Sequence, residues 1–258
     1  MAAERLLLFD LDGTLLRSDK SISSFTMEAL ARCRQRGLLL GVATARSEQN
    51  ARRFLADLRP DAVVSSGGAL AKWREKEIYR AVFSPFETRR LLDAAQSICP
   101  GGCGITVDTL HTHFWNDKEA LKQAGPSWGE SVYTDYLDFQ ESALKICVEL
   151  SERAQAERIA ASVAGCVWVK FSGGDWYSFS KEAATKERAL VALSAQAGIP
   201  FDQMIAFGDD YGDISMLQLC GKGVAMGNAI PEVKAAADMV IGSNDEDGIA
   251  RFLAGRYP

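Results

Sequence analysis

The sequence predicts an α/β protein, with a doubly wound parallel sheet as its core and a smaller inserted α+β domain. Two observations predict this fold class. In the first and the last third of the chain, short continuous apolar runs alternate with segments of helical spacing, as in buried parallel strands joined by helices. In the middle, apolar and polar residues alternate, as in antiparallel strands with one covered face. We therefore expect a core of residues 1–82 and 181–258 and an insert of residues 83–180.

The first third contains three expected strands and two expected helices. Apolar runs at 5–10, 38–43 and 62–65 have the length and the composition of strands that are buried on both faces. Between them, residues 24–36 and 47–58 repeat apolar side chains at helical spacing. Because strands and helices alternate, we expect parallel βαβ units with helices on both faces of the sheet.

The strand–helix alternation stops near residues 78–82 and returns at about residue 182. Within the insert we expect helices near 85–98 and 151–162, a strand at 144–150, and a second alternating stretch that the turn Gly173-Gly174-Asp175 interrupts. In the last third, the expected elements are helices at 182–197, 212–220 and 231–236 and strands at 204–207, 223–226 and 239–241.

Composition argues against several classes of function. The net charge of −5 over 258 residues, without a long basic run, argues against a nucleic-acid partner. No apolar run approaches the roughly 18–20 residues of a membrane helix, and no secretory leader is evident, so we expect no membrane partner and a cytoplasmic protein. The six cysteines are scattered along the chain and lack a zinc-binding spacing. We therefore expect them to be reduced thiols. We place His111 and His113 on one face of a strand. The sequence does not indicate an oligomeric state.

Two carboxylates, one residue apart, follow the first strand. Asp10 and Asp12 belong to Phe9-Asp10-Leu11-Asp12-Gly13-Thr14-Leu15, where the strand ends and a loop begins. In an open α/β sheet, ligands bind beyond the carboxyl ends of the strands. Alternation points both side chains the same way if the chain is still extended there. Because two like charges at close range repel, we expect a hard divalent cation to compensate them.

Further polar residues follow two other strands of the expected sheet. Asp209 and Asp213 lie in an acidic loop after the strand at 204–207, and Thr44 and Arg46 follow the second strand. If these strands are neighbours, one crevice holds carboxylates for Mg²⁺ beside a hydroxyl and a cation for an anion, which are the parts needed to handle a phosphoryl group. Lys186 could add an ammonium. Each feature alone has an ordinary alternative: the acidic loops as solvated turns, Thr44 as a helix cap and Lys186 as a surface lysine.

This ordered set of motifs resembles that of the haloacid dehalogenase-like (HAD) hydrolases. Asp10-Leu11-Asp12-Gly13-Thr14 is similar to the first motif of the family, Thr44 to the second, Lys186 to the third and Gly208-Asp209-Asp210-Tyr211-Gly212-Asp213 to the fourth. The insert lies between the second and third motifs, which resembles a type II (C2B-like) cap of the Cof-type subgroup. The resemblance implies a Rossmann-like catalytic core with an inserted α+β cap domain.

The resemblance also implies an activity: a Mg²⁺-dependent phosphatase that hydrolyses a small phosphate monoester, such as a sugar phosphate or a related metabolite. Asp10 would attack phosphorus and form an aspartyl-phosphate, and Asp12 would act as general acid and base. Mg²⁺ would be held by Asp10, Asp209 and the backbone carbonyl of Asp12. Thr44 and Lys186, with backbone N–H groups near Leu11 and Ala45, would bind the phosphate.

The remaining implied roles are supporting ones. Asp213 would support the metal or orient Lys186, and Arg46 would contact the leaving group or form a structural ion pair. Asn228 belongs to a further matching run, Ala225-Met226-Gly227-Asn228-Ala229. For substrate selection the insert offers an amide and three aromatic side chains, each of which could instead belong to the core or the surface of the insert: Trp115, Asn116, Trp176 and Tyr177.

Two alternatives stay open, and only the second of them rests on departures from the family pattern. The subgroup usually has asparagine at the positions of Gly212 and Gly67, and a glycine there provides no side-chain amide for phosphate. One alternative is a phosphomutase acting on sugar phosphates, which would return the phosphoryl group to sugar while excluding water. The other is a catalytically weak binding or regulatory protein on the same scaffold.

Overall fold

The computed structural model describes residues 4–99, 101–123, 129–171 and 174–257. The chain forms two compact units. The first unit comprises Met1–Ala45, Leu55–Tyr79 and Thr185–Pro258, and the second comprises Arg46–Phe54 and Arg80–Ala184. The domain boundaries at 82/83 and 180/181 stay a prediction, and Gly173 of the expected turn lies outside the described residues.

The first unit is built on an eight-stranded sheet with the order β14-β13-β12-β1-β2-β3-β4-β5. Neighbouring strands from β14 to β3 pair in parallel, and β4 pairs antiparallel with β3. The strands are β1 (Leu6–Phe9), β2 (Leu39–Ala43), β3 (Ala62–Ser65), β4 (Leu70–Trp73), β5 (Lys76–Arg80), β12 (Met204–Gly208), β13 (Lys222–Ala225) and β14 (Met239–Val240). The predicted parallel core sheet is therefore confirmed, and β4 and β5 are strands that the sequence did not predict.

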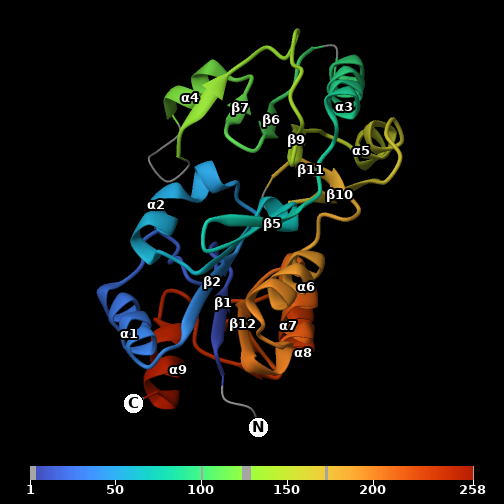
Figure 1. Cartoon of the computed structure of the whole chain (residues 1–258). Helices are drawn as coiled ribbons and strands as arrows, with labels where there is room; N and C mark the ends of the chain where they lie inside the picture. Colours follow the sequence, from blue (N-terminus) through green and yellow to red (C-terminus); the bar gives the residue numbers. More distant parts are fainter. Residues whose placement is uncertain (1–3, 100, 124–128, 172–173, 258) are drawn as a thin grey trace. The chain divides into compact units, whose positions relative to one another are not determined.

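Helices cover both faces of this sheet, as the strand–helix alternation predicts (Figure 1). Helix α1 packs against α9 and β2, whereas α6 and α7 pack against each other and against β3, β4, β12 and β13. The helices are α1 (Ser24–Gln35), α2 (Glu48–Leu58), α6 (Lys186–Ala197), α7 (Ile214–Leu219), α8 (Pro231–Ala236) and α9 (Gly248–Arg256), with 3₁₀ turns η1 (Ser66–Gly68), η3 (Phe201–Gln203) and η4 (Tyr211–Asp213). Helix α2 belongs to the second unit up to Phe54 and to the first unit from Leu55. Helix α6 begins four residues later than predicted, because the side chain of Thr185 caps it by accepting from the N–H of Arg188.

The second unit has an α+β fold with a six-stranded sheet, whose strand order is β10-β11-β9-β6-β7-β8. Its elements are α3 (Pro85–Ile98), β6 (Ile105–Asp108), β7 (His113–Trp115), α4 (Lys118–Gln123), β8 (Ser131–Tyr133), β9 (Lys145–Glu149), α5 (Arg153–Ala160), β10 (Cys166–Lys170) and β11 (Trp176–Lys181). The pairing is antiparallel except between β7 and β8. Helices α3 and α5 pack together, and buried residues of these helices and of the sheet form one hydrophobic core. Among the described helices of both units, none has the length and apolar character needed to span a bilayer.

Candidate active site

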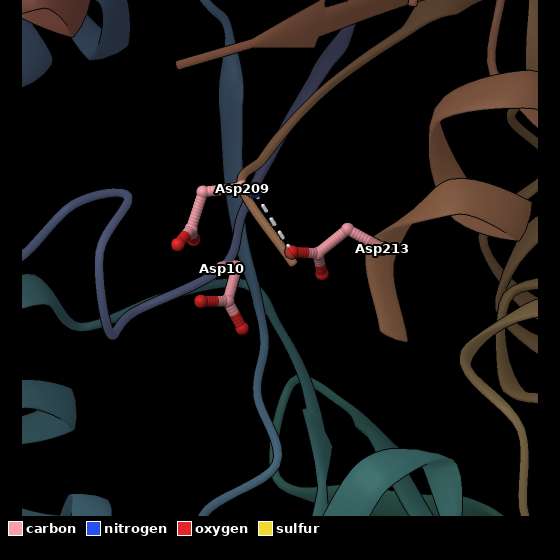
Figure 2. Close-up of side chains that lie close together, drawn as sticks. All are labelled: Asp10, Asp209 and Asp213. Carbon is pink, nitrogen blue, oxygen red and sulfur yellow. Dashed lines mark hydrogen bonds between the residues drawn. The ribbon is translucent and has the colours of Figure 1, made fainter. Parts of the chain in front are cut away.

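Strand register brings the two acidic loops together. In the first unit β1 and β12 are direct neighbours, with Phe9 opposite Phe207, and the N–H of Asp10 donates to the carbonyl of Phe207 (3.0 Å). The residues that follow both strands therefore emerge at one edge of the sheet. Asp10, Asp209 and Asp213 each offer a carboxylate oxygen there, and these oxygens all lie within 4.8 Å of one another (Figure 2). The predicted convergence of the first and the late acidic loop is thus present.

One lysine lies between two of these carboxylates. The Nζ of Lys186 donates to Oδ1 of Asp10 (2.8 Å) and to Oδ1 of Asp213 (2.5 Å), and the lysine side chain is 5% exposed. Lys186 is the first residue of α6, so the position of that helix end decides where the ammonium lies. Gly68 permits this position: a Cβ there would come within 2.5 Å of Thr185 and Lys186 backbone atoms, and its φ of +105° favours glycine.

The late loop is held by its own hydrogen bonds. The second oxygen of Asp213, Oδ2, accepts from the backbone N–H groups of Asp209 (3.0 Å) and Asp210 (3.2 Å). Thr14 Oγ1 donates to Oδ1 of Asp209 (2.6 Å), which links the first motif to the fourth. Gly13 lies against the same carboxylate, since a Cβ there would come within 2.2 Å of Asp209 Oδ2. Sequence reasoning assigned no role to Thr14, although it stands in the first motif.

Burial makes the ionisation of two of these carboxylates, Asp10 and Asp209, unfavourable. Burial raises the pKa of Asp10 well above its usual value, and the charge of Lys186 offsets only part of this effect. Burial also raises the pKa of Asp209, to about 6. Burial lowers the pKa of Lys186, but the charges of Asp10 and Asp213 outweigh it and hold that pKa above its usual range. With all three carboxylates ionised and Lys186 charged, this cluster of described residues carries a net charge of about −2, and hard oxygen ligands in this number suit a divalent cation.

Asp12 lies apart from the three clustered carboxylates. Its side chain is 38% exposed and its Oδ1 accepts from Nζ of Lys20 at 2.8 Å. Among the described side chains, the group that could hold a metal contains Asp213 and not Asp12. Ligation through the backbone carbonyl of Asp12 therefore stays a prediction. Lys20 is a contact that sequence reasoning missed.

The loop after β2 comes to the same edge of the first unit, because β2 is the other neighbour of β1. The Thr44 side chain is buried, and the Thr44 carbonyl accepts from the N–H of Gly67 (3.0 Å). Thr44 does not cap α2, because Ser47 Oγ accepts from the N–H of Asn50 in that helix (3.2 Å). Ala45 is exposed, whereas the Leu11 side chain is buried.

The two glycines that replace asparagine stand in open space. A Cβ at Gly67 or at Gly212 would meet no heavy atom within 4 Å. Packing therefore does not require glycine at either position. Gly67 has a φ of +72°, a conformation that asparagine also tolerates.

The remaining supporting residues make structural contacts. Arg46, in the second unit, is 8% exposed, donates to the carbonyl of Asn50 (3.3 Å) and lies 5.3 Å from the ring centre of Phe54. Asn228, in the first unit, is exposed, and its Nδ2 donates to the carbonyl of Gly13 (2.7 Å) while its Oδ1 accepts from the N–H of Asn244 (3.1 Å). Asn228 thus holds the loop that follows Asp12.

The polar residues of the second unit mostly serve its own fold. Asn116 bonds the backbone N–H of Ile105 and the carbonyl of Cys103, Trp115 meets Trp176 edge to face, and Tyr177 is 2% exposed. His111 precedes β7, so the two histidines do not share a strand as expected.

A buried charge cluster in this unit is separate from those side chains. His113 Nδ1 lies 2.6 Å from Asp108 Oδ1, and Lys145 Nζ lies 3.1 Å from Asp108 Oδ2. Burial would raise the pKa of Asp108, but Lys145 and His113 outweigh it and hold that pKa well below its usual range.

Comparison with known proteins identifies relatives along nearly the whole chain. A family model described as haloacid dehalogenase-like hydrolase matches residues 7–253. The chain is 28% identical to the pyridoxal phosphate phosphatase YbhA of Escherichia coli, covering 96% of this chain and 97% of that protein. It is 29% identical to the HMP-PP phosphatase of Cronobacter sakazakii, covering 96% and 94%. Among solved structures, the HAD subclass IIB sugar phosphatase BT4131 superposes with a TM-score of 0.82 at 26% identity, covering 98% of each chain.

Proposed function

The chain belongs to the haloacid dehalogenase-like hydrolases, and from its site we propose that it is a Mg²⁺-dependent phosphatase that hydrolyses a small phosphate monoester through an aspartyl-phosphate on Asp10. One observation carries the proposal. The oxygens of three aspartates from two strand ends lie within 4.8 Å of one another, with a buried lysine bonded to two of them. This arrangement combines ligands for a hard cation with a cation for phosphate, which phosphoryl transfer needs.

Asp10 supports the role of nucleophile by its position. It is 7% exposed, and Lys186 holds its Oδ1 in a fixed direction, so the carboxylate is oriented before a substrate arrives. Attack of an Asp10 oxygen on phosphorus forms a P–O bond as the bond to the leaving oxygen breaks. Asp12 then gives that oxygen a proton, and later takes a proton from the water that hydrolyses the aspartyl-phosphate. Lys186 and the Thr44 hydroxyl would bind the phosphoryl oxygens.

The donor set fits Mg²⁺. Asp10, Asp209 and Asp213 would hold or surround the ion. Burial raises the pKa of Asp10 and of Asp209, so a cation bound there would favour their ionised forms. Bound there, Mg²⁺ would neutralise the repulsion between carboxylate and phosphate and polarise a phosphoryl oxygen. The hydrogen bond from Thr14 to Asp209 orients one of these carboxylates, as outer partners of metal ligands commonly do.

The test is phosphate release from a panel of phosphorylated metabolites with and without Mg²⁺, with Asp10→Asn as the blank. The panel begins with the compounds in the relatives' names, pyridoxal phosphate and HMP-PP, and with sugar phosphates. We expect Mg²⁺-dependent turnover that Asp10→Asn abolishes while the variant keeps its fold by circular dichroism. Turnover of wild-type size in Asp10→Asn would refute the role of Asp10.

The same assay separates the two alternatives. Release of inorganic phosphate from sugar monophosphates without a bisphosphate activator distinguishes a phosphatase from a phosphomutase. A binding or regulatory protein would turn over no phosphate ester, including p-nitrophenyl phosphate. A cytoplasmic location stays a prediction.

A further inference from the structure

An ion pair outside the carboxylate cluster fixes one side chain of the site. Asp12 Oδ1 accepts from Lys20 Nζ at 2.8 Å, and both side chains are about two-fifths exposed, at 38% and 40%. An exposed ion pair contributes little to the free energy of unfolding, so stabilising the fold does not explain this contact. Its geometry has a consequence, however: one oxygen of the Asp12 carboxylate is held in a set direction at the edge of the sheet.

The backbone of Lys20 provides an independent observation. Its φ is +62°, a left-handed conformation that lysine rarely adopts and that glycine adopts without strain. The residue lies in a tight turn in which its N–H donates to the carbonyl of Arg17 (2.9 Å) and the N–H of Arg17 donates to the carbonyl of Ser21 (2.9 Å). A strained residue that persists at a site suggests that its side chain is needed there.

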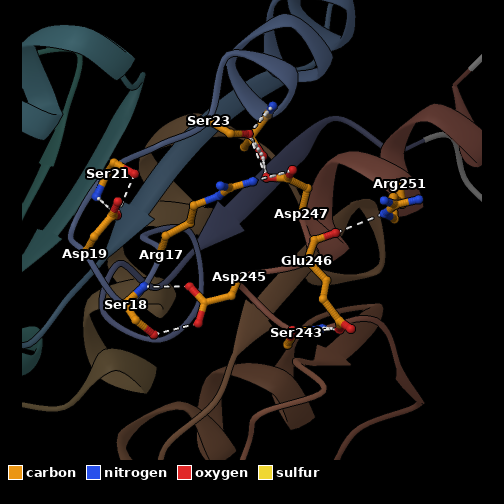
Figure 3. A network of polar contacts seen from close by, with 11 residues as sticks. Arg17, Ser18, Asp19, Ser21, Ser23, Ser243, Asp245, Glu246, Asp247 and Arg251 are labelled. Carbon is orange, nitrogen blue, oxygen red and sulfur yellow. Dashed lines mark hydrogen bonds and ion pairs between the residues drawn. The ribbon is translucent and has the colours of Figure 1, made fainter.

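The turn that carries Lys20 is clamped from the far end of the chain. Figure 3 shows the carboxylate of Asp245 accepting from both the N–H (2.8 Å) and the hydroxyl (2.7 Å) of Ser18. Asp247 accepts from Arg17 Nη2 (2.6 Å) and from the hydroxyl of Ser23 (2.6 Å), on the two sides of the turn. These contacts span more than 220 residues of sequence, so the position of the turn is set by tertiary structure.

A third contact continues the clamp toward the first motif. Asn244 Nδ2 donates to the carbonyl of Leu16 (2.8 Å), and the N–H of Asn244 donates to Asn228, which itself holds the carbonyl of Gly13. The segment 243–247 therefore fixes the loop on both sides of the Lys20–Asp12 pair. Such a clamp makes the direction of the Lys20 side chain a built feature of the first unit.

We propose that Lys20 is a positioning residue that aligns the Asp12 carboxylate for proton transfer to and from the reacting oxygens. This inference rests on the proposed function of Asp12 as acid and base. Proton transfer requires a heavy-atom separation of about 2.6–3.2 Å, and a displacement of about 1 Å costs about 100-fold in rate. Lys20 supplies the alignment, and Asp12 alone exchanges the proton.

The test compares two esters in the variant Lys20→Met. Loss of an alkoxide from a sugar phosphate needs a proton from Asp12, whereas the phenolate that leaves p-nitrophenyl phosphate is stable without one. The parameter kcat/KM reports the steps up to departure of the leaving group, before hydrolysis of the aspartyl-phosphate. We expect Lys20→Met to lower kcat/KM about 10- to 100-fold for the sugar phosphate. For p-nitrophenyl phosphate we expect a loss of no more than about 3-fold, because that departure needs little general-acid help.

A double-variant comparison tests whether Lys20 acts through Asp12. Asp12→Asn combined with Lys20→Met should be no slower than Asp12→Asn alone, because the residue being aligned is already lost. A further loss in the double variant, an equal loss on both esters, or a loss expressed only as a raised KM would overturn the proposal. Each result would mean that Lys20 binds phosphate or the leaving group itself.

Two controls separate this role from folding and from the proposed function. Lys20→Gly relieves the left-handed strain, so it should keep the unfolding temperature within about 2 °C of wild type while showing the same selective loss. Glu75→Gly, at a second left-handed position (φ +65°) in the turn between β4 and β5, should change neither ester. If wild type proves inactive, crystal structures of wild type and Lys20→Met still decide the inference. An unchanged Asp12 rotamer in the variant would overturn it.

Discussion

Replacing Lys186 by methionine should destabilise the metal-free protein by about 3–5 kcal/mol near pH 8, which is the usual cost of removing one partner of a buried ion pair. The structure gives the reason. The ammonium is 5% exposed and bonds Asp10 at 2.8 Å and Asp213 at 2.5 Å. At an effective dielectric constant near 20, each such pair is worth roughly 6 kcal/mol of Coulomb energy before the cost of desolvating the charges is subtracted. Without the lysine, two buried carboxylates face each other uncompensated.

The deficit should depend on pH, with a sign that follows from Asp10. Burial raises the pKa of Asp10 in the folded state, and Lys186 opposes this rise, so its removal raises the pKa further. A group whose pKa is higher in the folded than in the unfolded state stabilises the fold at low pH, and this stability is lost as the pH rises through the folded pKa. The loss in Lys186→Met should therefore be smallest near pH 5 and largest near pH 8.

The assay is urea unfolding in the presence of a chelator at several pH values, followed by circular dichroism and by hydrogen exchange in β1 and β12. Lys234→Met, on α8, is the matched control. Saturating Mg²⁺ should stabilise Lys186→Met more than wild type, because the carboxylate group then carries one more uncompensated negative charge. A loss below about 1 kcal/mol, or one that is equal at all pH values, would refute the reasoning, since a buried pair that costs so little is not formed in solution.

Three further predictions concern the metal, the phosphate and the second unit. Because burial raises the pKa of Asp209 to about 6, protons should compete with Mg²⁺, so that the apparent Mg²⁺ affinity falls as the pH drops below 6. Calorimetry of Mg²⁺ binding in two buffers at pH 5.5 should detect proton release. Binding without proton release would contradict this competition. Gly212→Asn enters open space, so its amide should tighten competitive inhibition by inorganic phosphate about 10-fold, and an unchanged inhibition constant would show that the amide does not reach the phosphate. Lys145→Met should lower the free energy of unfolding by about 3–5 kcal/mol in a denaturant titration, because it leaves Asp108 buried without its partner. Part of this loss should be recovered when Asp108→Asn is added. Strictly additive losses would rule out the Lys145–Asp108 pair as the cause.

The sequence predicts the core sheet because its signal is local. Each of the strands β1, β2, β3 and β12 is a short apolar run followed by a loop, and the alternation with helices dictates parallel pairing. The hairpin of β4 and β5 gave no such signal. It turns at Arg74 and Glu75, which adopt left-handed backbone without glycine or asparagine to mark the turn. Helix α9 was not predicted either. It begins after Asp247, another left-handed residue, whose side chain does not cap the helix.

The same distinction separates the parts of the site. Asp10 and Asp209 could be placed together from sequence because both directly follow strands that are neighbours in a parallel sheet. The contact of Thr14 with Asp209 joins residues 195 positions apart, and no spacing rule predicts it. The role of Thr44 as a helix cap could be excluded only when Ser47 was seen to occupy that position.

The two carboxylates of the first motif are consequently held by different physical means. Asp10 is fixed by the register of β1 with β12, by burial and by its bond to Lys186, so few other single substitutions outside the sheet should move it. Asp12 is two residues further on, half exposed and bonded to a turn whose position depends on side chains of the segment 243–247 (Figure 3). Local unfolding draws on weakly buried segments first, so the turn of residues 17–21 should exchange its amide hydrogens well before β1 does. If the proposed chemistry is correct, nucleophile and proton donor are stabilised separately, and changes in the C-terminal segment should affect proton transfer while leaving the carboxylate cluster intact.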